Sequence, residues 1–169
     1  GYDAIASCTS CSMALRQEYP ELFDIDGVDT VSRNTFESVE YLRIHEDLRS
    51  EIQSAEVDDE IEKEFAYHAP CHARNQGINR QAVELFGELD DVTIEDVGDS
   101  CSGISGTYGW KEEKYETSME IGEEMFDHME AVDATTGMTE CPTCSSQMEH
   151  GTGYDIRHPI ELLSVALVQ

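Results

Sequence analysis

Hydrophobic and polar positions follow two different periods along this chain, and segments with one period alternate with segments with the other. Short apolar segments of the kind that form strands occur at 2–6, 65–68, 92–97, 135–140 and 154–156. Apolar residues that recur every three or four positions predict helices at 12–19, 35–55, 77–86, 112–131, 144–150 and from 159 onward. Strands that alternate with helices predict an α/β fold, with a mainly parallel sheet and flanking helices.

Local residue chemistry predicts where the first helices begin and end. Pro20 is expected to stop the first helix, because proline has no backbone N–H to donate. Gly27 and its neighbours are expected to form a loop. Asn34 or Thr35 is suited to cap the long second helix. The acidic residues 56–62 are expected to form a solvated connection.

Three cysteine segments each follow a predicted strand directly. The carboxyl ends of parallel strands lie at one edge of a sheet, so the topology can bring four thiols together. These thiols belong to Cys71, Cys101, Cys141 and Cys144. Glycines at 103, 106 and 109 let the backbone beside Cys101 pass close to a bulky group. Four thiolates complete the shell of an iron–sulfur cluster or of zinc, so we expect one metal centre.

A second Cys-x-x-Cys pair lies near the start of the chain. Residues 7–13, which hold Cys8 and Cys11, resemble residues 140–146. This similarity favours two related units: the end of a first cysteine-rich unit with a helical connection at 1–62, and a second unit at 63–169. We expect the two units to form one compact body. Cys8 and Cys11 either close a metal site with upstream ligands or simply pack.

Polar residues beside the cysteines are secondary candidates. His68 and His72 flank Cys71, where an imidazole can hydrogen-bond a cluster sulfur or accept a proton near a quinone. Ser102 follows Cys101 and can offer an oxygen ligand. The alternative for all three is an ordinary loop residue whose polar atoms bond the backbone.

Net charge and cysteine content restrict the classes of function that fit this chain. The chain has 169 residues, 37 acidic and 10 basic, with a formal net charge of −27. Such a surface repels nucleic acid, and acid spread along the whole chain is typical of proteins from extreme halophiles. Six cysteines in a chain of this length do not indicate a disulfide scaffold, so a reducing, intracellular setting is expected. No apolar run approaches the length of a membrane span.

The order of the cysteines resembles that of a known family. A lone Cys71 in Tyr-His-Ala-Pro-Cys-His, then Cys101-Ser102-Gly103, then Cys141-Pro-Thr-Cys144, is similar to the cysteine-rich domain family named for its Cys-Cys-Gly motif. Within that family, which includes heterodisulfide reductase B subunits, the chain most resembles the C subunits of anaerobic glycerol-3-phosphate dehydrogenase. Ser102 occupies the place of the second cysteine, which leaves four thiols, the number that holds a 4Fe–4S cluster.

The resemblance implies a role in anaerobic respiration. It implies an iron–sulfur electron-transfer subunit that receives electrons from flavin-containing dehydrogenase subunits and passes them toward membrane quinone. Such a subunit would be cytoplasmic and peripheral to the inner face of the membrane, and this chain would be the C-terminal part of it. Two alternatives stay open: a structural zinc domain that organises a complex, and a thiol–disulfide protein that uses Cys141 and Cys144 at a helix start.

The charge predicts a dependence of stability on salt. Raising salt from about 0.1 M to about 1 M shortens the Debye length from about 10 Å to about 3 Å and so screens self-repulsion. We expect the melting temperature of the chain to rise over this range. Thermal unfolding at several KCl concentrations measures it. A melting temperature that stays flat or falls would contradict the halophilic interpretation.

Overall fold

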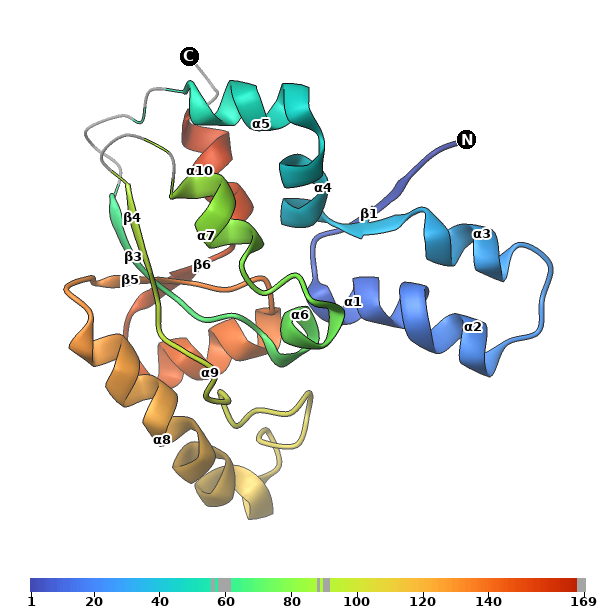
Figure 1. The fold of residues 1–169 in the computed structure, drawn as a ribbon. Coiled ribbons are helices and arrows are strands. Elements are labelled where there is room, and N and C mark those ends of the chain that lie inside the picture. Colours follow the sequence, from blue (N-terminus) through green and yellow to red (C-terminus); the bar gives the residue numbers. More distant parts are fainter. Residues whose placement is uncertain (56, 58–61, 88, 90–91, 167–169) are drawn as a thin grey trace.

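A four-stranded parallel sheet organises most of the chain in the computed structural model, which describes residues 1–55, 57, 62–87, 89 and 92–166 (Figure 1). Its strands are β3 (Glu64–Tyr67), β4 (Thr93–Asp96), β5 (Thr136–Met138) and β6 (Asp155–Arg157), in the order β4-β3-β5-β6. Tyr67 is in register with Asp96 on one side and Met138 on the other. The predicted α/β fold with a parallel sheet and flanking helices is confirmed.

The two faces of the sheet carry separate apolar cores, because successive strand residues point to opposite faces. Phe65 and Tyr67 pack with residues of α4 (Ser38–Ile44), α5 (Glu46–Gln53), α7 (Gln81–Phe86) and α10 (Pro159–Ala166). Ala66 packs on the other side with residues of α8 (Tyr115–Ala131) and α9 (Pro142–Thr152). Figure 1 shows the two groups of helices on opposite sides of the sheet.

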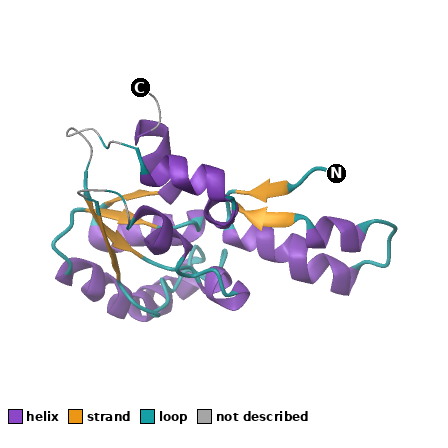
Figure 2. Ribbon diagram, turned by 45° about the horizontal axis from the view of Figure 1, so that its top comes forward, coloured by secondary structure: helices purple, strands orange, loops and turns teal. Residues whose placement is uncertain are grey.

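The first part of the chain forms a smaller unit with its own sheet. Strand β1 (Ala4–Ala6) pairs in parallel with β2 (Thr35–Glu37). Between these strands the chain runs out and back through α1 (Thr9–Met13), the π-helical segment η1 (Ala14–Glu18), α2 (Tyr19–Leu22) and α3 (Val28–Arg33). These helices form an arm that projects from the main body (Figure 2).

The expected stop at Pro20 is wrong. The helical run continues from Thr9 to Leu22, and Pro20 lies in the first turn of α2. Pro20 follows the π-helical segment η1, in which the Tyr19 N–H donates five residues back to the Ala14 carbonyl. The Ser32 hydroxyl donates to the Arg16 carbonyl of the same segment at 2.6 Å. Ser32 belongs to α3, which begins directly after the loop predicted at Gly27.

The long helix expected at 35–55 is also wrong. Residues 35–37 form β2, and the helical part is divided at His45 into α4 and α5. The cap of α4 is Glu37 rather than Asn34 or Thr35. Its carboxylate accepts hydrogen bonds from the backbone of Val39 and Glu40, and the Glu40 carboxylate accepts one from the Glu37 N–H. This reciprocal capping box fixes the start of α4.

Two helices begin at other residues than expected. Helix α6 (Cys71–Gln76) starts at a cysteine that was expected to lie in a loop. Gly77 ends this helix with φ 72°, a left-handed conformation that suits glycine, so the next helix, α7, begins only at Gln81 instead of residue 77. The short 3-10 turn η2 (Glu112–Lys114) leads into α8, and together they cover the helix predicted at 112–131.

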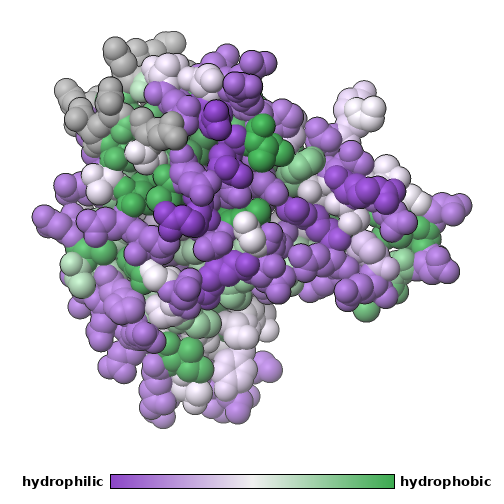
Figure 3. Space-filling model, viewed as in Figure 1, coloured by the Kyte–Doolittle hydropathy of each residue, from purple (hydrophilic) through white to green (hydrophobic). Residues whose placement is uncertain are grey.

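The surface is mostly hydrophilic. Figure 3 shows hydrophilic residues over most of the visible face, with apolar side chains in patches on the main body and at the outer end of the arm. Exposed apolar residues in that part of the chain are Leu22, Phe23 and Ile25. Among the described residues, no helix has both the length and the apolar character that crossing a bilayer requires.

Two carboxyl groups are buried where the smaller unit meets the main sheet. Glu37 is 1% exposed and Glu140 is 2% exposed. The Tyr67 hydroxyl donates to the Glu140 carboxyl, with its oxygen 2.9 and 3.1 Å from Oε1 and Oε2. Burial, and then the charge of Glu37, raise the pKa of Glu140 to about 8. Near neutral pH the Glu140 carboxyl of the folded protein therefore keeps a proton that the same carboxyl of an unfolded chain releases.

This proton predicts how stability depends on pH. The folded carboxyl has the higher pKa, so its contribution to stability is present below about 4.5 and is lost as pH rises through about 8. Relative to Glu140→Gln, the unfolding free energy of the unaltered chain should therefore fall over this range. Denaturant unfolding of both proteins at about pH 5 and about pH 9, at fixed salt, measures the difference. If the difference in unfolding free energy between the two proteins does not change with pH, the pKa of Glu140 is not raised.

Candidate metal centre

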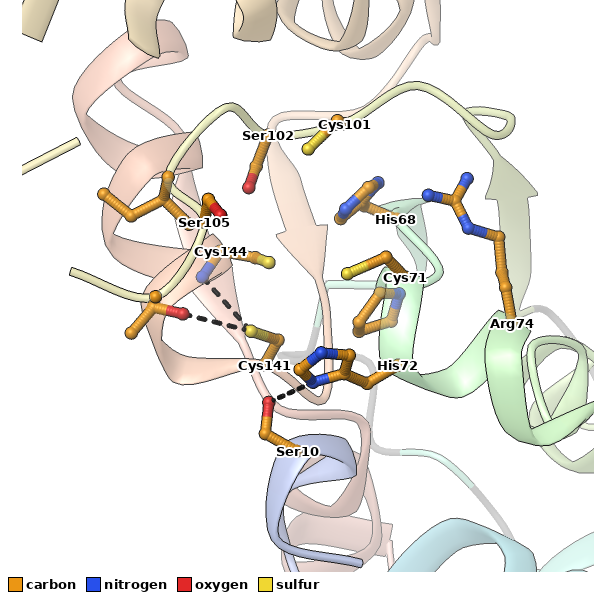
Figure 4. Close-up of a pocket in the computed structure, with 14 residues that line it drawn as sticks. Ser10, His68, Cys71, His72, Arg74, Cys101, Ser102, Ser105, Cys141 and Cys144 are labelled. Atoms are coloured by element: carbon orange, nitrogen blue, oxygen red, sulfur yellow. Dashed lines mark hydrogen bonds between the residues drawn. The ribbon is translucent and has the colours of Figure 1, made fainter. Parts of the chain in front are cut away.

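A pocket of about 350 Å³ lies at the carboxyl ends of the central strands. All four expected thiols line it, as do several polar side chains (Figure 4). The lining residues are Ser10, His68, Pro70, Cys71, His72, Arg74, Cys101, Ser102, Ile104, Ser105, Gly106, Cys141, Thr143 and Cys144. The structure thus brings together four cysteines from three distant segments, although their role as ligands stays a prediction.

The thiols are delivered by segments that directly follow three of the strands. Cys71 is the first residue of α6, after the turn that ends β3. Cys101 lies in the loop after β4 and, like Cys71, is exposed. Cys141 caps α9 after β5, and Cys144 lies one turn into that helix. Both are buried, so the pocket has two thiols at its floor and two at its opening.

The two buried thiols share a proton unequally. The pKa of Cys141 is lowered to about 5, chiefly by the hydrogen bond that its sulfur accepts from the Cys144 thiol. The Thr143 hydroxyl, 3.3 Å away, and the Cys144 N–H, at 3.4 Å, also bond this sulfur. The pKa of Cys144 is raised, first by the same thiol bond and then by burial. Cys141 is therefore a thiolate at neutral pH, which is the form that ligates metals.

Cys71, at the pocket opening, also resists ionisation. The pKa of Cys71 is raised, first by burial and then by the neighbouring Cys101 and Cys141. Four thiolates facing one pocket would repel one another without a cation among them. A bound iron or zinc group removes this repulsion, because metal binding favours the deprotonated form of each ligand.

The central loop is held tightly against α8. Gly103 has φ 84°, and a Cβ at this position would collide with the backbone carbonyl of Ser118. The Ser118 hydroxyl donates to the Gly103 carbonyl at 2.9 Å, and the Gln147 amide donates to that hydroxyl at 3.0 Å. The Gly103 N–H in turn lies 3.4 Å from the Cys101 sulfur. A residue with no side chain is needed here so that Cys101 can face the pocket.

The secondary candidates also line the pocket, in different ways. Ser102 is buried in the pocket wall near Cys144. The His72 ring nitrogen Nδ1 lies 2.7 Å from the Ser10 hydroxyl. Sequence reasoning missed Ser10 and Arg74 as lining residues. Arg74 lies one helical turn after Cys71, a spacing that offered a usable signal once α6 is recognised.

Cys8 and Cys11 do not belong to the residues that line this pocket. They lie beside each other at the start of α1, where the charge of Cys8 is the main cause of a raised pKa at Cys11. In the part of the chain that the structure describes, no three His, Cys, Asp or Glu side chains are arranged to hold one metal ion. Their role in metal binding stays a prediction.

The donor set of the pocket fits a thiolate-ligated metal centre. Four cysteines line a pocket of about 350 Å³, which leaves room for a group of several atoms. Cysteine sulfur is also the usual ligand of iron–sulfur clusters.

Comparison with known proteins defines the class. The model of the CCG cysteine-rich domain family matches residues 65–149, half of the chain, and the chain belongs to this family. Two curated relatives are the C subunits of the anaerobic glycerol-3-phosphate dehydrogenases of Escherichia coli K12 and Escherichia coli O157:H7. Each is 32% identical over 174 aligned residues, which cover 99% of this chain and 41% of the relative. The chain thus spans about two fifths of the length of these relatives.

The Gly103 contact gives a test of how the central loop is held. Gly103→Ala adds backbone strain and a collision with α8, and should destabilise the chain by about 3 kcal/mol or more. Gly153→Ala is the matched control, because Gly153 also has positive φ, 75°, but nothing within 4 Å of its Cβ position. Strain alone should cost this variant about 1–2 kcal/mol. Equal losses in thermal unfolding would show that the loop does not press on α8.

Proposed function

We propose that this chain is the cysteine-rich electron-transfer part of the C subunit of a glycerol-3-phosphate dehydrogenase, and that its pocket holds an iron–sulfur cluster. The observation that carries the proposal is the convergence of Cys71, Cys101, Cys141 and Cys144 on one pocket at the ends of three adjacent parallel strands. The relatives named above supply the class of complex.

The pocket residues would hold such a cluster in an asymmetric way. The lowered pKa of Cys141 favours its thiolate form, so Cys141 is the first expected ligand of the cluster. Cys144 would lose its proton when the cluster binds. Cys71 and Cys101 are exposed and would close the cluster from the solvent side. When bound, an iron–sulfur cluster carries one electron at a time, which suits a step between a two-electron flavin and a quinone.

The proposal extends to partners and place in the cell. Flavin-containing dehydrogenase subunits would donate the electrons, and membrane quinone would receive them. The chain would then be cytoplasmic and peripheral to the inner face of the membrane. Two exposed thiols at the pocket opening support this role, because an electron-transfer centre must come close to the surface that meets its partner.

Anaerobic reconstitution tests the proposal. The chain is incubated with ferrous iron, sulfide and reductant, and then iron, sulfide and the visible spectrum are measured. Cys101→Ser should lose the broad absorption and most of the iron, because a neutral hydroxyl is a poor substitute for a soft thiolate. Cys11→Ser is the matched control: it also removes an exposed thiol, but one outside the pocket, and should keep both iron and spectrum.

The same measurement separates the alternatives. Colourless protein that takes up zinc on the pocket cysteines would replace the cluster by a structural zinc site. Protein that binds neither metal, but whose Cys141 reacts rapidly with a disulfide, would indicate thiol–disulfide chemistry instead. Retention of native iron and spectrum by Cys101→Ser would show that Cys101 is not a ligand.

A further inference from the structure

His68 places a polar ring in a buried position beside the thiol pocket. It follows the last residue of β3, and its backbone N–H continues the sheet by donating to the Met138 carbonyl at 3.0 Å. Its side chain is 1% exposed and lines the thiol pocket. In Figure 4 the His68 ring lies between the sulfur atoms of Cys101 and Cys71, with Arg74 on its far side.

One ring nitrogen of His68 is buried without a partner. Nδ1 has no hydrogen bond to any residue that the structure describes. A buried polar atom left in this state costs about 1–3 kcal/mol, so such atoms in folded proteins normally have a partner. Since His68 borders the pocket, whatever fills the pocket is the natural source of that partner.

The other imidazole beside Cys71 shows the contrast. His72 also lines the pocket, but its Nδ1 lies 2.7 Å from the Ser10 hydroxyl. Its hydrogen-bonding needs at this atom are therefore met inside the protein. His68 and His72 line the same pocket and differ in whether Nδ1 has a partner in the protein.

The chemistry of the His68 ring also suits a donor. An imidazole carries an N–H, and in the neutral ring either Nδ1 or Nε2 can hold it. Arg74 lines the same pocket and forms an ion pair with Asp99, with Nη1 and Oδ1 3.3 Å apart, which keeps the guanidinium near the pocket.

We propose that His68 donates its buried Nδ1–H to a sulfur atom of the iron–sulfur centre, as a positioning residue that raises the centre's reduction potential. The inference rests on the proposed function, because the sulfur acceptor is the bound cluster or one of its thiolates. A hydrogen bond to sulfur stabilises the reduced centre more than the oxidised one, since reduction adds negative charge to the sulfurs. In a chain with a net charge of −27, such a donor offsets part of the cost of adding an electron.

Midpoint potentials of the reconstituted chain test the proposal. His68→Leu removes the donor, and the potential should fall by about 59 mV, which is tenfold in the equilibrium constant for one electron. His68→Gln keeps an N–H donor and should restore most of the loss. His72→Leu is the matched control, because it removes an imidazole whose Nδ1 is engaged with Ser10, and its potential should change by less than half as much. Equal potentials in His68→Leu and the unaltered chain would overturn the proposal.

A spectroscopic measurement keeps the test decisive if His68→Leu binds no iron. In the unaltered chain with ¹⁵N-labelled histidine, the reduced centre should show one weak nitrogen coupling, which His68→Gln abolishes. A strong coupling would make His68 a ligand, and no coupling would leave it without contact to the centre; either result overturns the proposal. If the unaltered chain takes up no iron and sulfide, the proposed function fails as well, whereas normal uptake with unchanged potentials removes this inference alone.

Discussion

The parallel pairing of β3 with β4 and β5 is the constraint on which the pocket depends. Because all three strands point the same way and are in register at Tyr67, their carboxyl ends meet at one edge of the sheet. Each strand then passes directly into a cysteine segment. A reversal of any one strand would send its thiol to the opposite edge, so the four-cysteine pocket is a property of sheet topology before it is a property of any loop.

Repulsion between negative charges opposes this arrangement. The chain carries a formal net charge of −27, two carboxyl groups are buried beside the sheet, and four thiols face one pocket. Bound protons reduce this negative charge in the folded protein. Glu140 keeps a proton because its pKa is raised, and the Cys144 thiol keeps another while it bonds Cys141. Arg74 is the one arginine or lysine among the described pocket-lining residues. A metal centre would replace the thiol protons as the source of positive charge.

Periodicity predicted the sheet and the main helices, because burial on two faces leaves a clear pattern in residues such as Phe65, Ala66 and Tyr67. It also predicted that Cys71, Cys101, Cys141 and Cys144 would meet, since strand direction and motif order suffice for that. It failed where tertiary contacts decide. The helical run continues through Pro20 by way of a π-helical segment that Ser32 of another helix contacts, and the start of α4 depends on a glutamate cap that a preference for Ser, Thr, Asp or Asn does not suggest. The isolated Nδ1 of His68 is a fact of burial, which sequence alone does not give.

The pocket also depends on the smaller unit, although all its cysteines come from the larger one. Ser10, in the first turn of α1, lines the pocket and bonds His72. Two residues of α6 thus meet α1, because Gln76 also donates to the Thr9 carbonyl at 3.0 Å. These bonds fix the helix that begins at Cys71 against the arm. A change in the first turn of α1 would therefore shift Cys71 relative to Cys101 and Cys141 without altering any of the four thiols, which makes the arm part of the wall of the site.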